Sequence, residues 1–149
     1  MKKLTSVLFA LSLLITATSF TPSEDDTVSA KVKSAFEKTF IAASDIEWKK
    51  VNGFYMVNFK INNQDCSAAY NEKGELMSAT RTIASSQLPL NISLALQNKY
   101  ANYTVDKSVT ELTVDNETFY YIKADNTKQS VTIKANSSDD LSIENKAKK

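Results

Sequence analysis

Cys66 carries the only thiol in the sequence, and the residues that usually make a cysteine catalytic are missing. The chain of 149 residues contains one cysteine and no histidine. Without histidine, neither a Ser-His-Asp triad nor a Cys-His pair forms in its usual arrangement, and the commonest transition-metal ligand is lost. A single cysteine makes neither an internal disulfide nor a cysteine-based zinc site. We therefore predict a protein that is not an enzyme, with no catalytic residue, no metal and no cofactor.

The remaining reactive groups have two readings each. Cys66 is either a reactive thiol or a small apolar core residue. The second reading is favoured because strand alternation places Cys66 beside Phe59 on an apolar face. The acidic residues 24–26 and 139–140 either bind Ca²⁺ or are solvated, and they lack the spaced oxygen ligands of a calcium loop. With only two glycines, the chain has no Gly-rich phosphate loop.

The first residues have the pattern of a secretory signal peptide. Lys2 and Lys3 precede an apolar run over residues 4–15, and Ala17 and Ser19 supply the small residues of a cleavage site. The apolar run is shorter than the ~20 residues that a membrane-spanning helix needs. We predict a signal peptide over residues 1–19.

The mature chain, residues 20–149, is then expected to be periplasmic or secreted, monomeric and without a membrane span. Removal of Lys2 and Lys3 from the 18 basic residues leaves one fewer than the 17 acidic ones. A near-neutral domain without a basic block is a poor binder of nucleic acid, so no nucleic-acid partner is expected.

Two segments with one apolar stripe each predict two amphipathic helices. Residues 28–40 and 88–100 place apolar side chains at helical spacing, and each position of the second stripe follows its counterpart by 60 residues. Downstream, Phe54-Tyr55 recurs as Phe119-Tyr120 at an offset of 65. We interpret the chain as two repeats, about residues 27–84 and 85–144.

Strand alternation after the first helix predicts four antiparallel strands. Asn52-Gly53 is a strong hairpin signal, and a two-residue turn there pairs Trp48 with Val57 and Ile46 with Phe59. The more apolar face of this unit is expected to pack on the helix. The predicted fold class is α+β: a tandem repeat of a helix plus a four-stranded antiparallel sheet, with the helices packed on one sheet face.

A set of helix, strand and turn motifs resembles the PepSY-like family of exported proteins from Bacteroidetes. The motifs are a V-x-x-x-V-x-x-A-F helix, an I-x-W strand, an N-G turn, a Y-x-V-x-F strand, an N-x-x-G turn and an L-P helix start. The resemblance covers about residues 27–143 and implies the fold of the β-lactamase inhibitory protein, but no activity. The residues that carry it are Val28, Val32, Ala35, Phe36, Ile46, Trp48, Asn52, Gly53, Tyr55, Val57, Phe59, Asn71, Gly74, Leu88 and Pro89.

The outer face of the predicted sheets carries the candidate binding residues Phe54, Met56, Phe119 and Tyr121. These apolar side chains either form a partner site or cover sheet edges and lie under loops. The function we expect is binding or inhibition of another protein through this face, and the resemblance to an inhibitor implies a secreted enzyme as partner. The alternative is a sensor of a small ligand or cell-wall fragment, which would need a concave pocket.

Overall fold

A computed structural model describes residues 28–149, and the signal peptide predicted over residues 1–19 lies outside them. The described chain contains the helices α2 (Ala30–Thr39) and α3 (Leu90–Lys99) and a short 3₁₀ turn, η3 (Ser85–Gln87). Neither helix is long and apolar enough to cross a membrane. The strands are β1 (Ser44–Val51), β2 (Phe54–Ile61), β3 (Gln64–Tyr70), β4 (Leu76–Ala84), β5 (Thr104–Val114), β6 (Glu117–Asp125), β7 (Gln129–Asn136) and β8 (Leu141–Lys148).

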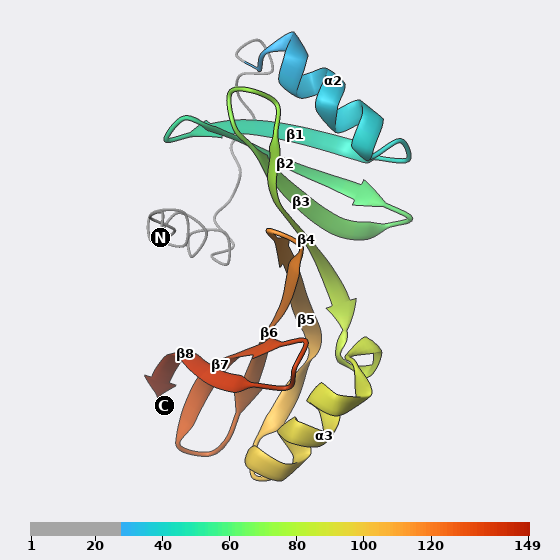
Figure 1. Ribbon diagram of the computed structural model, residues 1–149. Helices are drawn as coiled ribbons and strands as arrows, with labels where there is room; N and C mark the ends of the chain where they lie inside the picture. Colours follow the sequence, from blue (N-terminus) through green and yellow to red (C-terminus); the bar gives the residue numbers. More distant parts are fainter. Residues whose placement is uncertain (1–27) are drawn as a thin grey trace, which may run out of the picture.

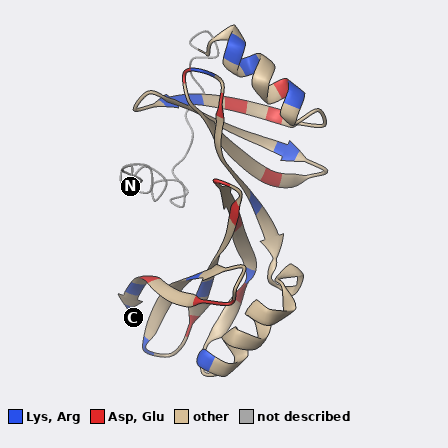
Figure 2. Ribbon diagram, viewed as in Figure 1, with Lys and Arg blue, Asp and Glu red and all other residues tan. Residues whose placement is uncertain are grey.

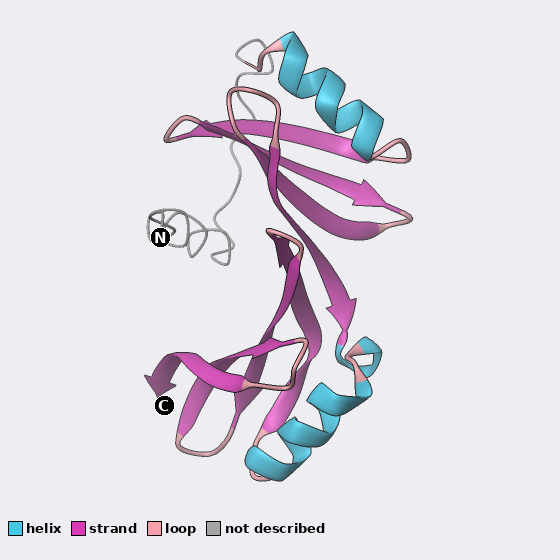
Figure 3. Ribbon diagram, in the orientation of Figure 1, coloured by secondary structure: helices cyan, strands magenta, loops and turns pink. Residues whose placement is uncertain are grey.

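The two helices lie where the apolar stripes predict them. The hydroxyl of Ser29 accepts a hydrogen bond of 3.3 Å from the backbone N–H of Val32 and caps α2. Pro89 takes the equivalent position before α3, where a missing N–H costs nothing. Each helix lies against one side of the strands (Figure 3). The buried helical residues are Val32 and Phe36 in α2 and Ile92 and Leu96 in α3.

The Asn-Gly turn produces the predicted strand register in the part of the first hairpin that lies next to the turn. Both turn residues have positive φ, 49° at Asn52 and 83° at Gly53, as a type I′ turn requires. Trp48 pairs with Val57 as predicted. The pairing of Ile46 with Phe59 is wrong, because the register shifts between Ser44 and Glu47 and leaves Ile46 44% exposed. Asp45, with φ of 50°, lies in this irregularity.

The predicted fold class is wrong, because the chain does not build two separate units with a four-stranded sheet each. Its eight strands form one continuous antiparallel sheet in the order β1 to β8 (Figure 1). The join is made by β4 and β5, which pair from Ser78↔Val114 to Ala84↔Ser108. Separate sheets would leave these two long strands as unpaired edges, and their pairing satisfies the backbone groups of both. A helix and two loops separate the two strands in sequence, so local patterns do not encode the pairing.

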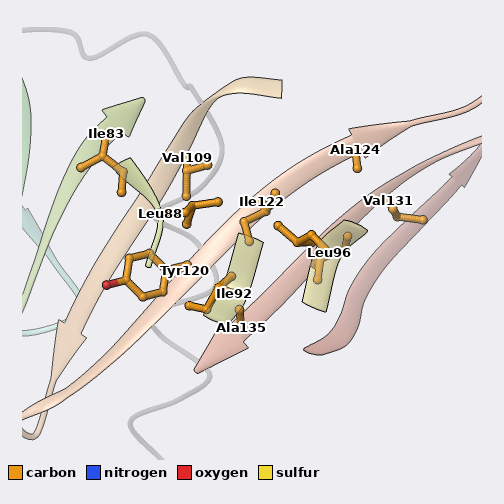
Figure 4. Close-up of a cluster of buried hydrophobic side chains, with 11 residues drawn as sticks. Ile83, Leu88, Ile92, Leu96, Val109, Tyr120, Ile122, Ala124, Val131 and Ala135 are labelled. Atoms are coloured by element: carbon orange, nitrogen blue, oxygen red, sulfur yellow. The ribbon is translucent and has the colours of Figure 1, made fainter. Parts of the chain in front are cut away.

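Both helices pack against the same side of this sheet and bury two apolar clusters. One cluster joins α2 to β2 and β3 through Phe36, Val57 and Tyr70, and the other joins α3 to β4 through β7. Figure 4 shows the second cluster, with Ile92 and Leu96 of α3 facing Ile122 and Ala135 of the strands. The sheet is strongly curved, and the helices lie on its convex side (Figure 1). The other side, which no described helix covers, is concave.

Candidate functional site

The helix-free side of the sheet, here called the concave face, is defined by strand register. Residues that pair directly across antiparallel strands share a face. One row of paired residues crosses this face from β1 to β6, and a second row runs from β1 to β7. The first row is Lys49, Met56, Ala69, Ser78, Val114 and Glu117; the second is Glu47, Asn58, Ser67, Thr80, Leu112, Phe119 and Asn136.

All four predicted contact residues lie on the concave face, but in two separate pairs. Phe54 and Met56 are on β2, whereas Phe119 and Tyr121 are on β6, with three strands between the pairs. Each of the four side chains is partly buried rather than fully exposed. Neighbouring strands lie about 4.8 Å apart, so a partner must span most of the face to contact both pairs.

The centre of the concave face is closed over by its own side chains. Ala69 and Ser78 are only 4% and 3% exposed although no described helix covers them. Their direct cross-strand neighbours are Met56 and Val114, whose larger side chains flank the two small ones. Leu112, 5% exposed, lies in the next row. A band of apolar and small residues therefore links the two predicted pairs across the sheet.

A lysine covers the aromatic pair on β6. The Nζ atom of Lys134 lies 4.5 Å from the ring centre of Phe119 and 5.9 Å from that of Tyr121, both within cation–π range. Glu144 of β8 holds this ammonium at 4.0 Å. Burial, and then the nearby Glu144 charge, raise the pKa of the Tyr121 hydroxyl, so Tyr121 presents a neutral ring and hydroxyl at physiological pH.

A polar hollow of about 640 Å³ occupies the β1–β4 end of the concave face. Its floor includes Asn58, Ser67 and Thr80, and the hydroxyls of Ser67 and Thr80 lie 2.6 Å apart in a hydrogen bond. At its rim the Lys60 ammonium lies 3.6 Å from the Asp45 carboxylate. None of the four predicted contact residues lines it, so the face combines an apolar band with a separate polar hollow.

On the convex face, an ion pair lies across the join between the two apolar clusters. Arg81 of β4 donates to both carboxylate oxygens of Glu111, directly across on β5, at 2.6 and 3.1 Å. Hydrogen bonding to Glu111 raises the pKa of the Arg81 guanidinium. A planar fork of this kind holds two side chains in one geometry. It reinforces the strand pairing that makes the sheet continuous.

Cys66 lies on the helix-bearing side, paired with Phe59 as its strand position predicts. Its thiol is partly buried and donates a weak hydrogen bond to the carbonyl of Gln64 at 3.5 Å. Burial is the largest cause that raises its pKa. A raised pKa lowers the thiolate fraction at neutral pH, which is the reverse of what a nucleophilic cysteine needs.

Among residues 28–149, no group of three or more acidic or cysteine side chains is placed to hold a metal ion. Asp139 and Asp140 instead lie in a turn that Asn136 closes. The Oδ1 atom of Asn136 accepts hydrogen bonds from the backbone N–H groups of Ser138 and Asp140. Asn71 closes the β3–β4 turn in the same way. Asp139 and Asp140 are therefore explained as residues of a turn.

The sequence reasoning missed the residues that make the concave face continuous. Leu112 and Val114 lie on β5, and the sequence alone does not place them on this face because the register of β5 is set by its pairing with β4. The alternation of Thr110, Leu112 and Val114 is the signal that could have found them. Arg81 and Glu111 are 30 residues apart and give no local signal.

The geometry defines a class of protein by its fold: one curved eight-stranded antiparallel sheet with two helices on its convex side. No protein-family model and no curated protein matches the sequence. Among solved structures, a DUF2874 family protein from Bacteroides ovatus has a TM-score of 0.69 at 21% identity, covering 83% of this chain and 89% of its own. A DUF2874 family protein from Bacteroides uniformis has a TM-score of 0.69 at 14% identity, covering 80% and 88%.

A BLIP-like protein from Bacteroides fragilis has the same architecture, with a TM-score of 0.68 at 18% identity, covering 87% of this chain and 88% of its own. At these identities the likeness establishes the fold alone. The expected likeness to the fold of the β-lactamase inhibitory protein is confirmed to that extent. Membership of the PepSY-like family stays a prediction.

Proposed function

We propose that this chain is an exported, non-enzymatic protein that binds another protein on the concave face. The observation that carries the proposal is that both helices pack on the convex side, which leaves the other side of the sheet without a covering element among residues 28–149. A face of this kind that combines partly buried aromatic residues with a polar surround resembles the make-up of protein interfaces.

Phe54, Met56, Phe119 and Tyr121 are the proposed apolar contacts. Aromatic and methionine side chains are enriched in interfaces, and a few such anchors usually dominate the binding free energy. The apolar band through Leu112 and Val114 connects the two pairs, so one partner surface could contact both. The BLIP-like description of one structural neighbour makes a secreted enzyme a reasonable class of partner, and the signal-peptide pattern supports export.

Position-dependent photo-cross-linking tests this proposal. A photoreactive amino acid is introduced at Tyr121 on the concave face and, in a matched variant, at Leu94, which is 50% exposed on α3 on the convex side. Both proteins are produced in the native host and irradiated. We expect one discrete cross-linked protein from the Tyr121 position and none from the Leu94 position. Equal cross-linking from both positions, or none from Tyr121, would contradict the proposal.

A further inference from the structure

A cavity of about 500 Å³ opens on the convex side, between α3, η3 and the first residues of β5. Its volume falls within the range of about 300–1,000 Å³ that is usual for small-molecule sites. It lies on the side of the sheet opposite the proposed protein-binding face, so its function can be tested separately. Its lining includes Leu88, Leu96, Gln97, Tyr100, Ala101 and Tyr103, together with three serines.

The aromatic residues that follow α2 and α3 both pack against the core cluster of their own helix, but they contact different rings. After α2, the ring of Phe40 packs into the core, 4.6 Å from Phe59 and 5.4 Å from Phe36 between ring centres. At the matching place after α3, Tyr100 packs edge to face with Tyr103 at 5.5 Å. The register of β5 is also broken between Val105 and Val109. These two features, together with η3, shape the wall of the cavity.

The cavity has an apolar floor and a polar rim. Leu88 and Leu96, 8% and 4% exposed, belong to the core cluster drawn in Figure 4 and form the floor. The hydroxyl of Tyr103 is held by a hydrogen bond from the side-chain amide of Gln129, which fixes that ring. Serine hydroxyls and the amide of Gln97 stand around the opening. An apolar floor with a few polar groups is the usual composition of a ligand site.

None of the lining residues carries a charge. In Figure 2, α3 is uncharged along almost its whole length, in contrast to α2. A charged ligand would lose hydration here without an opposite charge to compensate, so a neutral ligand is favoured. Tyrosine rings stack on the C–H faces of sugar rings, while serine and glutamine pair with hydroxyls through hydrogen bonds. We propose that this cavity binds a neutral saccharide.

An NMR titration with matched sugars tests the proposal. N-acetylglucosamine and glucosamine share one ring but differ in charge, and glucuronate supplies the opposite charge. We expect N-acetylglucosamine to produce saturable shifts of backbone amides confined to residues 85–105, and the two charged sugars to bind at least tenfold more weakly. Absence of saturable shifts with the neutral sugar, or equal binding of a charged one, would overturn the proposal.

Substitution at Ala101 separates the cavity from other surfaces. Ala101 is exposed at the opening, so Ala101→Trp fills the cavity without altering the core, and Ala101→Ser is the matched control. We expect Ala101→Trp to weaken N-acetylglucosamine binding more than tenfold while Ala101→Ser and Tyr121→Ser bind as the parent does. Equal binding by Ala101→Trp would place the sugar elsewhere and refute the assignment. The Tyr121→Ser control keeps the result independent of the proposed protein-binding face.

Discussion

The ammonium of Lys134 lies 4.5 Å from the ring centre of Phe119, across the strands β7 and β6 on the concave face. This contact places a positive charge over the aromatic one of the two apolar pairs proposed to bind a partner. The same ammonium is held by Glu144 at 4.0 Å. A partner that approaches Phe119 must therefore either accommodate Lys134 or displace it from Glu144.

Replacing Lys134 tests the strength of this contact. Lys134→Met keeps an apolar stem but removes the charge, so we expect a loss of about 1 kcal/mol in the free energy of unfolding. Urea denaturation measures it. Lys123→Met is the control, because Lys123 lies on the same face of β6 as Phe119 and Tyr121 and is exposed. Equal effects of the two substitutions would show that the ring contact contributes nothing.

Trp48 packs against α2, but its side chain is partly buried rather than fully buried as the sequence predicts. Its ring lies 5.3 Å from that of Phe36, edge to face, and 6.3 Å from that of Tyr70. We expect Trp48→Ala to cost about 3–5 kcal/mol and Trp48→Phe much less, because phenylalanine keeps part of the aromatic contact. Thermal and urea unfolding measure both. A cost below about 1 kcal/mol for Trp48→Ala would mean that the indole does not support the core.

The hydroxyl of Tyr70 is buried and makes no hydrogen bond that meets normal geometry with residues 28–149. Burial is the largest cause that raises the pKa of the Tyr70 hydroxyl, and the Thr39 side chain offsets it only in part. Removing an unsatisfied buried hydroxyl relieves a desolvation cost, so Tyr70→Phe should stabilise the fold by up to about 1 kcal/mol. Tyr55→Phe, directly across on β2, is the matched control.

A clear loss of stability on Tyr70→Phe, larger than that on Tyr55→Phe, would contradict this expectation. It would show that interactions of the Tyr70 hydroxyl stabilise the folded protein by more than the desolvation of that hydroxyl destabilises it. Urea unfolding of both variants under the same conditions decides between the two outcomes.

Cys66 should react slowly at neutral pH. Burial raises the pKa of the Cys66 thiol above the usual value. The thiolate fraction is therefore small until the pH exceeds the pKa of a free cysteine. We expect the rate of alkylation by iodoacetamide in the folded protein to rise at higher pH than in the urea-unfolded protein. Fast alkylation of the folded protein near pH 7 would instead indicate an activated thiol.

Local chemistry explains which parts of the fold could be predicted. The stripe of Val32 and Phe36 and the Asn52-Gly53 turn each act over a few residues, and the structure confirms the helix and the pairing of Trp48 with Val57. The displaced Ile46 depends on a left-handed backbone at Asp45, a conformation that non-glycine residues adopt only uncommonly. Composition and residue spacing therefore do not predict the displacement of Ile46.

Long-range pairing explains what could not be predicted. The contact between Ser78 and Val114 joins strands that lie on either side of α3, and it turns two expected sheets into one. The continuous apolar band on the concave face follows from that pairing. The cavity beside Tyr100 depends on the packing of η3 and the break in β5, which alternation alone does not reveal.

The most direct test of the proposed function is to measure, by calorimetry with purified proteins, the affinity of the cross-linked partner for two double variants. Met56→Ser with Tyr121→Ser alters the concave face; Leu90→Ser with Leu94→Ser alters α3, where these leucines are 74% and 50% exposed. We predict that both double variants stay folded, that the first weakens binding more than tenfold and that the second binds as the parent does. Unchanged affinity in a folded Met56→Ser, Tyr121→Ser protein would contradict binding through the concave face.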